Sequence, residues 1–204
     1  MKVIYYNKIY TWQVDGRFEP LKLMIIGSPG SGKSTFARRL AEQLDYPIFY
    51  LDRYWHQTDY SEAAKQRFIH EQQTFLQSHL DCIIDGNYVG SMAIRMQGSD
   101  VILWLQVSRW RAVWRVIKRS IATRCFHETR PDMAPSFREH FDWEYLKFLK
   151  FVWDYPRANR QEIPRIHQQV ASGKPLLIIR NDTEKEAFLT KLVNQTKKPD
   201  KENR

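Results

Sequence analysis

The fold of this 204-residue chain is decided by one segment, which reads Leu23-Met24-Ile25-Ile26-Gly27-Ser28-Pro29-Gly30-Ser31-Gly32-Lys33-Ser34. From Gly27 to Ser34 it matches the pattern G-x-x-x-x-G-K-[ST] without a gap. The apolar run before the loop is typical of a buried parallel strand. Residues 34–44 after it repeat apolar side chains at helical spacings of three and four. Strand, glycine-rich loop and amphipathic helix in this order predict a phosphate-binding loop.

A loop of this kind binds phosphates through its backbone and its lysine. Glycines let successive N–H groups point inward, toward the positive end of the following helix. The Lys33 ammonium is expected to reach the β- and γ-phosphates, and the Ser34 hydroxyl is expected to hold Mg²⁺. The sequence therefore predicts that ATP or GTP binds with Mg²⁺ on Gly27, Ser28, Pro29, Gly30, Ser31, Gly32, Lys33 and Ser34.

The composition is that of a globular protein with an excess of positive charge. Thirty-two Lys and Arg against 23 Asp and Glu leave a net charge of +9, which favours anionic partners such as nucleotides, phosphorylated metabolites, nucleic acid or a membrane surface. No apolar stretch approaches the roughly 20 residues of a spanning helix. The chain begins without a signal-peptide pattern, and two cysteines cannot build a disulfide framework. We therefore expect a cytoplasmic protein without a membrane partner.

Strand and helix patterns alternate along the chain. The expected strands are 23–26, 47–51, 82–84, 101–105 and 176–179. The expected helices are 34–44, 61–79, 109–122, 139–153, 158–172 and 183–195, the last with a capping box of Thr183 and Glu186. Alternation of this kind predicts one α/β domain, 22–195, with a mainly parallel sheet. The long connection between the last two strands predicts a helical insertion with a lid at about 123–136.

The two ends of the chain stand outside this domain. Residues 1–21 are expected to form an N-terminal extension, in which 3–6 and 9–12 can pair as a hairpin around Asn7-Lys8. Residues 196–204 are mostly charged and are expected to be a disordered tail.

Polar residues follow the second and third strands, where ligands of parallel α/β sheets bind. Asp52 is placed either to accept a proton from an acceptor hydroxyl or to cap a turn, and we favour the first role. Asp85 is placed to hold Mg²⁺ or its waters. The residues expected around the acceptor are Asp52, Tyr54, Asp85, Asn87, Tyr88 and Arg95.

Arginines concentrate between residues 109 and 130. Guanidinium groups suit the oxygens of a transferring phosphoryl group, although a run of arginines on a helix is also typical of a solvated face. Arg119 and Arg124, where the helix gives way to the lid, are the expected catalytic pair, together with Lys33 and Asp52. Aromatic and basic residues alternate over 141–157, which indicates either core packing or a nucleic-acid stacking surface. No cysteine or histidine spacing predicts a zinc site.

Four segments together resemble one known family. They are residues 24–35, the turn Leu51-Asp52-Arg53, the run 85–88 and the run Thr129-Arg130-Pro131-Asp132-Met133. They resemble the adenylate-kinase-like P-loop proteins called DNA topology modulation proteins. The resemblance implies a five-stranded parallel sheet in the order 2-3-1-4-5, an acceptor-binding region and an arginine-bearing lid. It implies ATP and Mg²⁺ as ligands of Gly30, Gly32, Lys33, Ser34 and Thr35, and Arg119 and Arg124 as lid arginines.

Two details of the resemblance concern the acceptor. The run 52–55 is similar to the Asp-x-aromatic turn of uridine-kinase-like enzymes, in which the aspartate faces the acceptor hydroxyl. The run Asp85-Gly86-Asn87-Tyr88 lacks the Phe-Pro-Arg continuation of true adenylate kinases, which argues against AMP as the acceptor.

The leading hypothesis is an ATP-dependent kinase of a nucleoside, nucleotide or similar small metabolite. A nucleotide-dependent DNA-binding or DNA-topology regulatory protein without kinase activity is the alternative, and a plain NTPase switch is a third. The sequence leaves open the acceptor, the preference for ATP or GTP, direct DNA binding and the oligomeric state.

Overall fold

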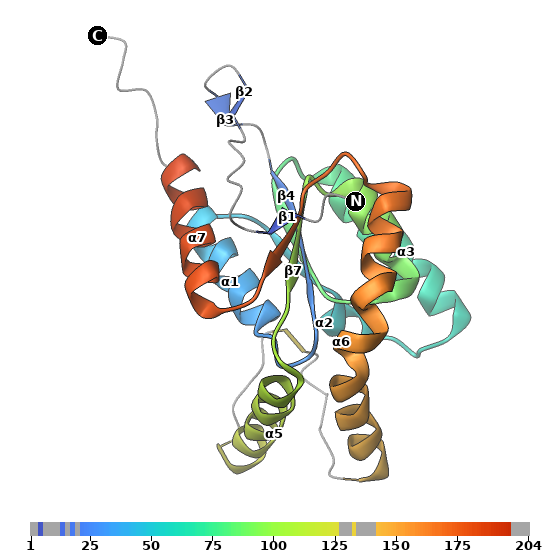
Figure 1. The fold of residues 1–204 in the computed structure, drawn as a ribbon. Helices are drawn as coiled ribbons and strands as arrows, with labels where there is room; N and C mark the ends of the chain where they lie inside the picture. Colours follow the sequence, from blue (N-terminus) through green and yellow to red (C-terminus); the bar gives the residue numbers. More distant parts are fainter. Residues whose placement is uncertain are drawn as a thin grey trace.

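A parallel β-sheet forms the centre of the computed structural model, which describes residues 4–5, 13–14, 17–18, 21–126, 132–133 and 142–196 (Figure 1). Its core strands are β4 (Lys22–Gly27), β5 (Ile48–Tyr50), β6 (Cys82–Asp85), β7 (Val101–Leu105) and β8 (Leu176–Ile179). They lie in the order β5-β6-β4-β7-β8 with every neighbouring pair parallel. Counted along the chain this order is 2-3-1-4-5, which confirms the predicted fold.

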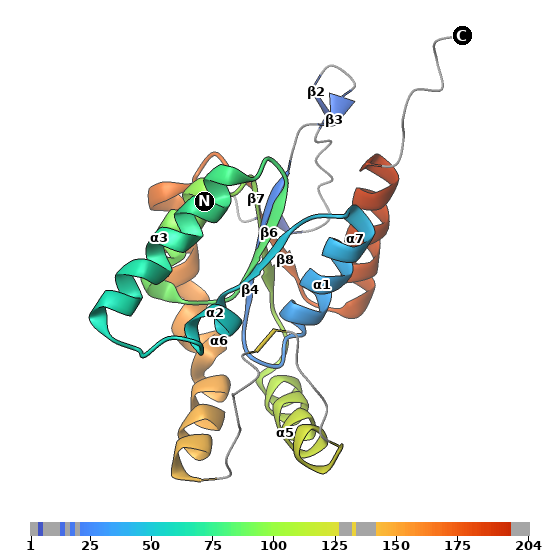
Figure 2. The ribbon, with the colours of Figure 1, turned by 180° about the vertical axis from the view of Figure 1, so that it is seen from behind.

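Helices cover both faces of the sheet (Figures 1 and 2). On one face, α1 (Lys33–Leu44) and α7 (Asp182–Thr196) cover a cluster that contains Leu23 and Ile25. On the other, α3 (Glu62–Ser78), α4 (Met92–Gly98) and α6 (Trp143–Val170) cover a cluster that contains Met24 and Ile26. Successive side chains of a strand point to opposite faces, so an uninterrupted apolar run is what a strand buried on both sides requires.

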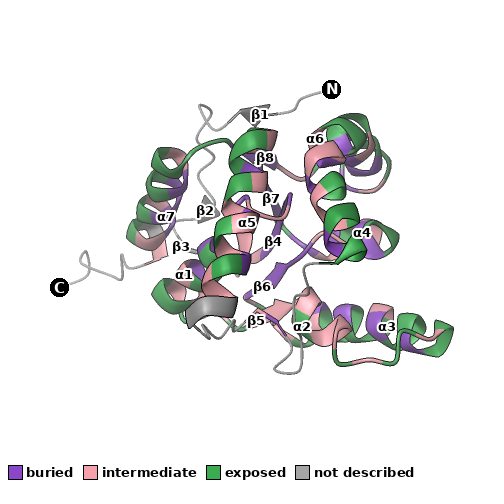
Figure 3. Ribbon diagram, turned by 90° about the horizontal axis from the view of Figure 1, so that it is seen from below, coloured by how far each residue is buried: buried purple, intermediate pink, exposed green. Residues whose placement is uncertain are grey.

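Helix α5 (Arg109–Phe126) and the first half of α6 extend beyond the carboxyl ends of the strands (Figure 1). Ala112 and Val116 of α5 are buried against Val152 of α6. Seen from below, β4, β6, β7 and β8 are almost entirely buried and β5 is half-buried, whereas much of α5 is exposed (Figure 3). These two helices therefore flank the edge of the sheet at which parallel α/β proteins bind ligands.

Helix α6 is continuous, whereas the sequence predicts two helices, 139–153 and 158–172. The helix runs through Pro156 and Pro164 over 28 residues. Each interior proline costs about 3 kcal/mol. The helix buries one apolar face, at about 1.5–3 kcal/mol for each large side chain, made of Tyr145, Val152, Tyr155, Ile163 and Ile166. Burial of this face outweighs the cost of the two prolines.

The N-terminal extension contributes two pairings that the sequence does not predict. Strand β1 (Ile4–Tyr5) adds to the sheet edge, parallel to β8, and strands β2 (Gln13–Val14) and β3 (Arg17–Phe18) form an antiparallel pair. The predicted hairpin of 3–6 with 9–12 lies largely outside the described residues and stays a prediction. An open strand edge offers unpaired backbone groups to any nearby segment, and β1 uses those of β8.

Two short elements and one cap complete the description. Helix α2 (Leu51–Trp55) follows β5, and a single 3-10 turn, η1 (Val89–Ser91), precedes α4. The cap of α7 is formed by Asn181 and Glu184, because Asn181 Oδ1 accepts from the Glu184 amide at 2.8 Å; the predicted box of Thr183 and Glu186 was wrong by two residues. Within the described residues, no helix is both long and apolar enough to cross a membrane.

Candidate active site

The loop between β4 and α1 has the backbone that its glycines allow. Gly30 and Gly32 adopt left-handed conformations, with φ of 78° and 82°. A Cβ at Gly30 would lie 2.3 Å from the carbonyl oxygen of Ala112 in α5, so only glycine fits there. No side chain caps the start of α1, and its first turn holds no acidic residue. Its free backbone N–H groups are therefore available to an anion.

The residues predicted in the loop face three different cavities. A first cavity of about 480 Å³ is lined by Gly30, Gly32, Lys33, Ser34 and Thr35. Pro29 lines a second cavity of about 670 Å³, and Ser28 lines a third. Ser31 is fully buried within the loop. Lys33 and Arg119 line both the first and the second cavity, so they mark the border between the two.

Asn87 fixes the start of the loop. Its Oδ1 accepts from the Gly27 amide at 2.9 Å, and its Nδ2 donates to the Gly27 carbonyl. The Tyr155 hydroxyl of α6 donates to the same Oδ1 at 3.0 Å. Asn87 and Tyr155 also line the second cavity. The residue predicted near the acceptor thus connects the loop to α6.

Arg95 lies behind the loop that follows β6 and lines none of these three cavities. Its side chain is fully buried and donates to the carbonyls of Gly86, Asn87 and Tyr88 at 2.7, 3.1 and 2.7 Å. Burial lowers the pKa of Arg95 to about 9, which leaves it charged at neutral pH. The sequence placed Arg95 at the acceptor, whereas the geometry makes it a support for the residues that line the cavity.

Asp52 lies between Lys33 and Tyr88. Its Oδ2 is 3.8 Å from the Lys33 ammonium nitrogen. Burial raises the pKa of the Tyr88 hydroxyl, and the charge of Asp52 and a hydrogen bond that Tyr88 donates to it add to the rise. The N-cap position of α2 is Tyr50, not Asp52, and no side chain makes a capping bond to this helix. Asp52 instead lines the second cavity.

Tyr54 is placed away from the cavities. Its ring stacks between Phe49 and Phe68, with centroid separations of 5.6 and 5.7 Å. His56, one turn of α2 away from Asp52, lines the second cavity instead. His56 lines the cavity in place of Tyr54 because the residues after β5 form a one-turn helix rather than the predicted turn. The helix directs Tyr54 toward the core.

Asp85 and Ser34 have the chemistry of a magnesium site. Asp85 is only 3% exposed, its Oδ1 has no hydrogen-bond partner in the protein, and the Ser34 hydroxyl donates to it. Burial raises the pKa of Asp85 to about 6, opposed by the Lys33 charge. Mg²⁺ prefers oxygen ligands and is often held by one or two carboxylates plus substrate phosphates. The residues present fit that ion, although no group of three or more His, Cys, Asp or Glu gathers within the described part of the chain.

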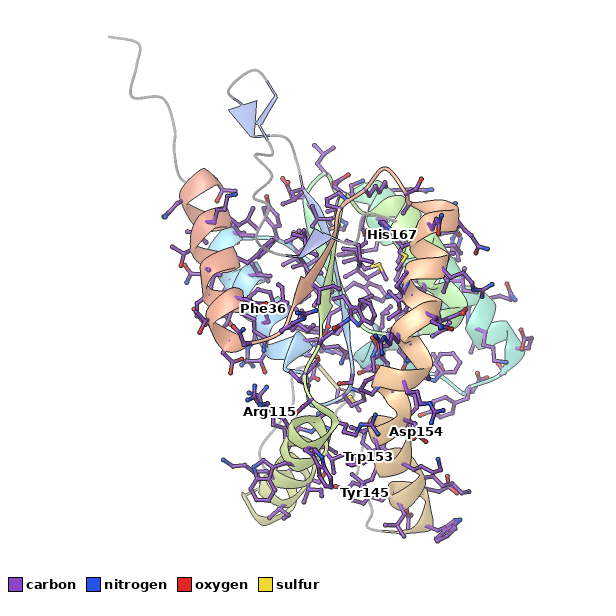
Figure 4. The ribbon with its side chains drawn as sticks, in the orientation of Figure 1. Phe36, Arg115, Tyr145, Trp153, Asp154 and His167 are labelled. Atoms are coloured by element: carbon purple, nitrogen blue, oxygen red, sulfur yellow. The ribbon has the colours of Figure 1, made fainter. Side chains whose placement is uncertain are left out.

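Two residues of the first cavity were missed by the sequence. Lys185 of α7 is buried and donates to the Ser31 carbonyl at 3.1 Å and to Asp182 at 2.9 Å. Arg115 of α5 pairs with the same Asp182 at 3.2 Å (Figure 4). For Lys185 the sequence does offer a signal. Helix α7 follows the last strand, and the carboxyl end of a parallel strand lies at the ligand-binding edge of the sheet.

The second cavity has an aromatic wall. The sequence did not decide whether these aromatic residues pack in the core or form a stacking surface for nucleic acid. That wall comes from one face of α6 and consists of Tyr145, Phe148, Phe151 and Tyr155, with Asn159 beyond them. Tyr145 and Tyr155 are buried, whereas Phe151 is half exposed. Asp142 and Glu144 lie at the start of the same helix and also line the cavity.

Most of the predicted lid is outside the described residues. Residues 127–131 and 134–141 and the side chain of Arg124 belong to that part, so the role of Arg124 stays a prediction. Of the described remainder, Asp132 lines the first cavity and Met133 the second.

Comparison with known proteins supports the fold. No protein-family profile matches the chain, and no curated protein matches it either. A candidate kinase from Chloroflexus aurantiacus is similar in structure at a TM-score of 0.54 and 20% identity, over 87% of this chain and 98% of the other. Shikimate kinase from Acinetobacter baumannii, solved with shikimate, is similar at 0.50 and 13% identity, over 86% and 92%. The chain therefore has the P-loop fold found in nucleotide and shikimate kinases.

Proposed function

We propose that this protein transfers the γ-phosphoryl group of Mg·ATP to a hydroxyl of a small acceptor. One observation carries the proposal: Lys33 lines both the first and the second cavity, and Asp52, which lines the second, lies 3.8 Å from its ammonium group. Phosphoryl transfer needs a nucleotide and an acceptor on opposite sides of one reacting phosphorus atom. Two cavities that meet at a lysine, with an aspartate beside it on one side, are suited to that arrangement.

Each group then has a stated role. The loop N–H groups and Lys33 hold the β- and γ-phosphates, while Ser34 and Asp85 hold Mg²⁺, which neutralises phosphate charge when bound. Asp52 orients the acceptor hydroxyl and takes its proton as the oxygen bonds to the γ-phosphorus and the β–γ bridge breaks. The Tyr88 hydroxyl fixes the Asp52 carboxylate. Arg119 lies where charge on the transferring group develops.

The lining of the second cavity favours an acceptor without phosphate. Its wall is aromatic, and among its described residues the only lysine and arginine are Lys33 and Arg119, which the transferring group itself requires. Asp142 and Glu144 add negative charge at one end. Such a cavity suits a hydroxyl compound with a planar or apolar body that is neutral or cationic. Among the predicted acceptors, a nucleoside-like compound therefore fits better than a nucleotide.

The experiment measures ADP formation from Mg·ATP with a panel of nucleosides, nucleoside monophosphates, sugars and hydroxylated amines, with Lys33→Ala as the blank. We expect a nucleoside-like or amine-bearing alcohol to raise ADP formation many-fold and the monophosphates to have little effect. ATP binding without stimulation by any acceptor would count against the proposal.

The DNA-binding alternative has one observation in its favour. Trp110 and Trp114 of α5 are 72% and 65% exposed on a chain of net charge +9, and exposed aromatic rings among cations are typical of single-strand binding. The likeness to DNA topology modulation proteins belongs with this alternative. It predicts oligonucleotide binding whose association constant falls linearly with salt on a double logarithmic scale, and loss of that binding in Trp110→Ala.

A further inference from the structure

The third cavity lies outside the nucleotide and acceptor cavities. It has a volume of about 840 Å³ and opens at the carboxyl ends of β7 and β8, between the start of α5 and the middle of α6. Leu105 and Ile178 form part of its floor, together with Trp104, Val107, Pro156 and Pro164. This volume is within the range of small-molecule sites, and neither the fold nor the proposed kinase reaction uses it.

Four arginines from three segments line this cavity. They are Arg109 at the start of α5, Arg157 and Arg160 of α6, and Arg180 after β8. No aspartate or glutamate is among the described residues of the lining. The first cavity differs, because there Arg115 and Lys185 both pair with Asp182. The described lining of the third cavity therefore carries four arginines and no carboxylate.

The carboxylates nearby on α6 are already paired. Asp154 pairs with Lys150, and Glu162 pairs with Arg165. Throughout the part of the chain that the structure describes, no carboxylate pairs with Arg157 or Arg160. Guanidinium groups that lack carboxylate partners and share one cavity are suited to bind phosphate oxygens in bidentate fashion.

Aromatic rings lie next to the arginines. The Arg109 guanidinium carbon is 5.0 Å from the centre of the Trp153 ring, and Trp153 meets Trp110 edge-to-face at 4.5 Å, in the space between α6 and α5 (Figure 4). Guanidinium and indole in such contact provide a flat surface beside the charged groups. A ligand with both phosphates and a planar or apolar body would use both features.

We propose that the third cavity is a second anion site, which binds an organic phosphate of at least two negative charges apart from the ATP and the acceptor. Two of its walls belong also to the reaction site: Ser28 is in the phosphate loop and accepts from the Ser31 amide at 3.0 Å, and Tyr155 donates to Asn87. Occupancy of the cavity therefore changes nucleotide affinity, and the nucleotide changes anion affinity by the same factor.

The test is calorimetric titration of inorganic pyrophosphate into protein whose nucleotide site is saturated with ADP, without Mg²⁺. We expect one site per chain, weakened about tenfold or more in Arg157→Gln/Arg160→Gln. Arg165→Gln, on the same helix but outside the cavity, is the matched control and should bind as the wild type does. Arg180→Gln alone tests a second wall and should weaken binding several-fold, which protects the result against a folding defect in the double variant.

Two results would overturn the proposal. The first is pyrophosphate binding that is lost in Lys33→Ala but unchanged in the arginine variants, because the anion would then occupy the phosphate loop. The second is failure of pyrophosphate to bind while a single-stranded 12-nucleotide DNA binds and depends on Trp110, because the arginines would then belong to a nucleic-acid surface. Both variants of α6 are checked by circular dichroism and thermal unfolding before titration.

Discussion

On the proposed nucleotide side of Lys33, the groups assigned to the phosphates come from consecutive residues, 27–34, whereas the proposed acceptor side is assembled from α2, the residues after β6 and one face of α6. Left-handed glycines and one helix start set the shape of the nucleotide side. The shape of the acceptor side depends on how distant segments pack. If the proposal holds, phosphate binding is a local property of this chain, and acceptor choice is a tertiary one.

Lys33→Ala should have the largest effect, because Lys33 lines both the nucleotide and the acceptor cavity. We expect Lys33→Ala to lower kcat by about 10³-fold or more, because the ammonium meets the phosphates where charge develops in the transition state. Lys65→Ala is the control, because Lys65 is exposed on α3 and, within the described residues, forms an ion pair with Glu62 alone. A Lys33→Ala protein that keeps both its thermal stability and its full turnover would contradict the role of the loop.

Asp52→Asn should lower turnover without weakening ATP binding, and so distinguish the acceptor side from the nucleotide side. The amide keeps the shape of the side chain but cannot take a proton, so kcat should fall by about 10²–10⁴-fold, while the ATP dissociation constant measured by titration changes little. Turnover that stays at the wild-type value would return Asp52 to a structural role. A large loss of ATP affinity would instead place Asp52 on the nucleotide side.

Asp85→Asn should reveal what burial of this carboxylate costs the folded state. Burial raises the pKa of Asp85 from 3.8 to about 6, so between these pH values the folded state holds a proton that the unfolded chain has released. The free energy of unfolding therefore falls as pH rises through this window. A shift of about two pKa units corresponds to about 3 kcal/mol.

Urea unfolding at several pH values measures this effect. At pH 7.5 Asp85→Asn should be more stable than the wild type by up to about 3 kcal/mol, and the difference should shrink toward zero near pH 4. Asp45→Asn, an exposed position at the end of α1, should show no such pH-dependent gain. A constant difference between Asp85→Asn and wild type at all pH values would contradict the inferred burial cost.

The parts of the fold that were predicted correctly depend on neighbouring residues. The strand–loop–helix unit and the five core strands follow from apolar runs and the glycine pattern, because a strand buried on both faces reads as a continuous apolar run. The order of the strands was implied by the family resemblance instead. The two predicted helices 139–153 and 158–172 are one helix because packing of its apolar face, which a local pattern does not contain, outweighs Pro156 and Pro164.

The acceptor side could be predicted only in part for the same reason. Asp52 and Tyr88 line the second cavity, and their contact with an acceptor stays a prediction. Nothing local shows that Arg95 turns inward to three carbonyls or that Tyr54 packs between two phenylalanines. Lys185 is brought to the loop by α7, which lies more than a hundred residues away in the chain. Side-chain direction and long-range contact, not residue type, decide these roles.

Tyr155→Phe should have the smallest effect and test the link between the two sides. The hydroxyl donates to Asn87, which holds Gly27, and burial raises the pKa of Tyr155 so that it stays protonated. Its removal should cost about 0.5–1.5 kcal/mol of stability and raise the KM for ATP a few-fold, although the ring lines the acceptor cavity.

Tyr54→Phe is the matched control for that change, because within the described residues the Tyr54 hydroxyl makes no hydrogen bond and its ring is held by Phe49 and Phe68. It should leave the KM for ATP unchanged. If Tyr155→Phe raised the KM for the acceptor alone, the hydroxyl would serve only the acceptor cavity, and Asn87 would hold the loop without help from α6. A rise in the KM for ATP, from a residue on the acceptor wall, would instead show that packing of α6 sets the shape of the phosphate loop.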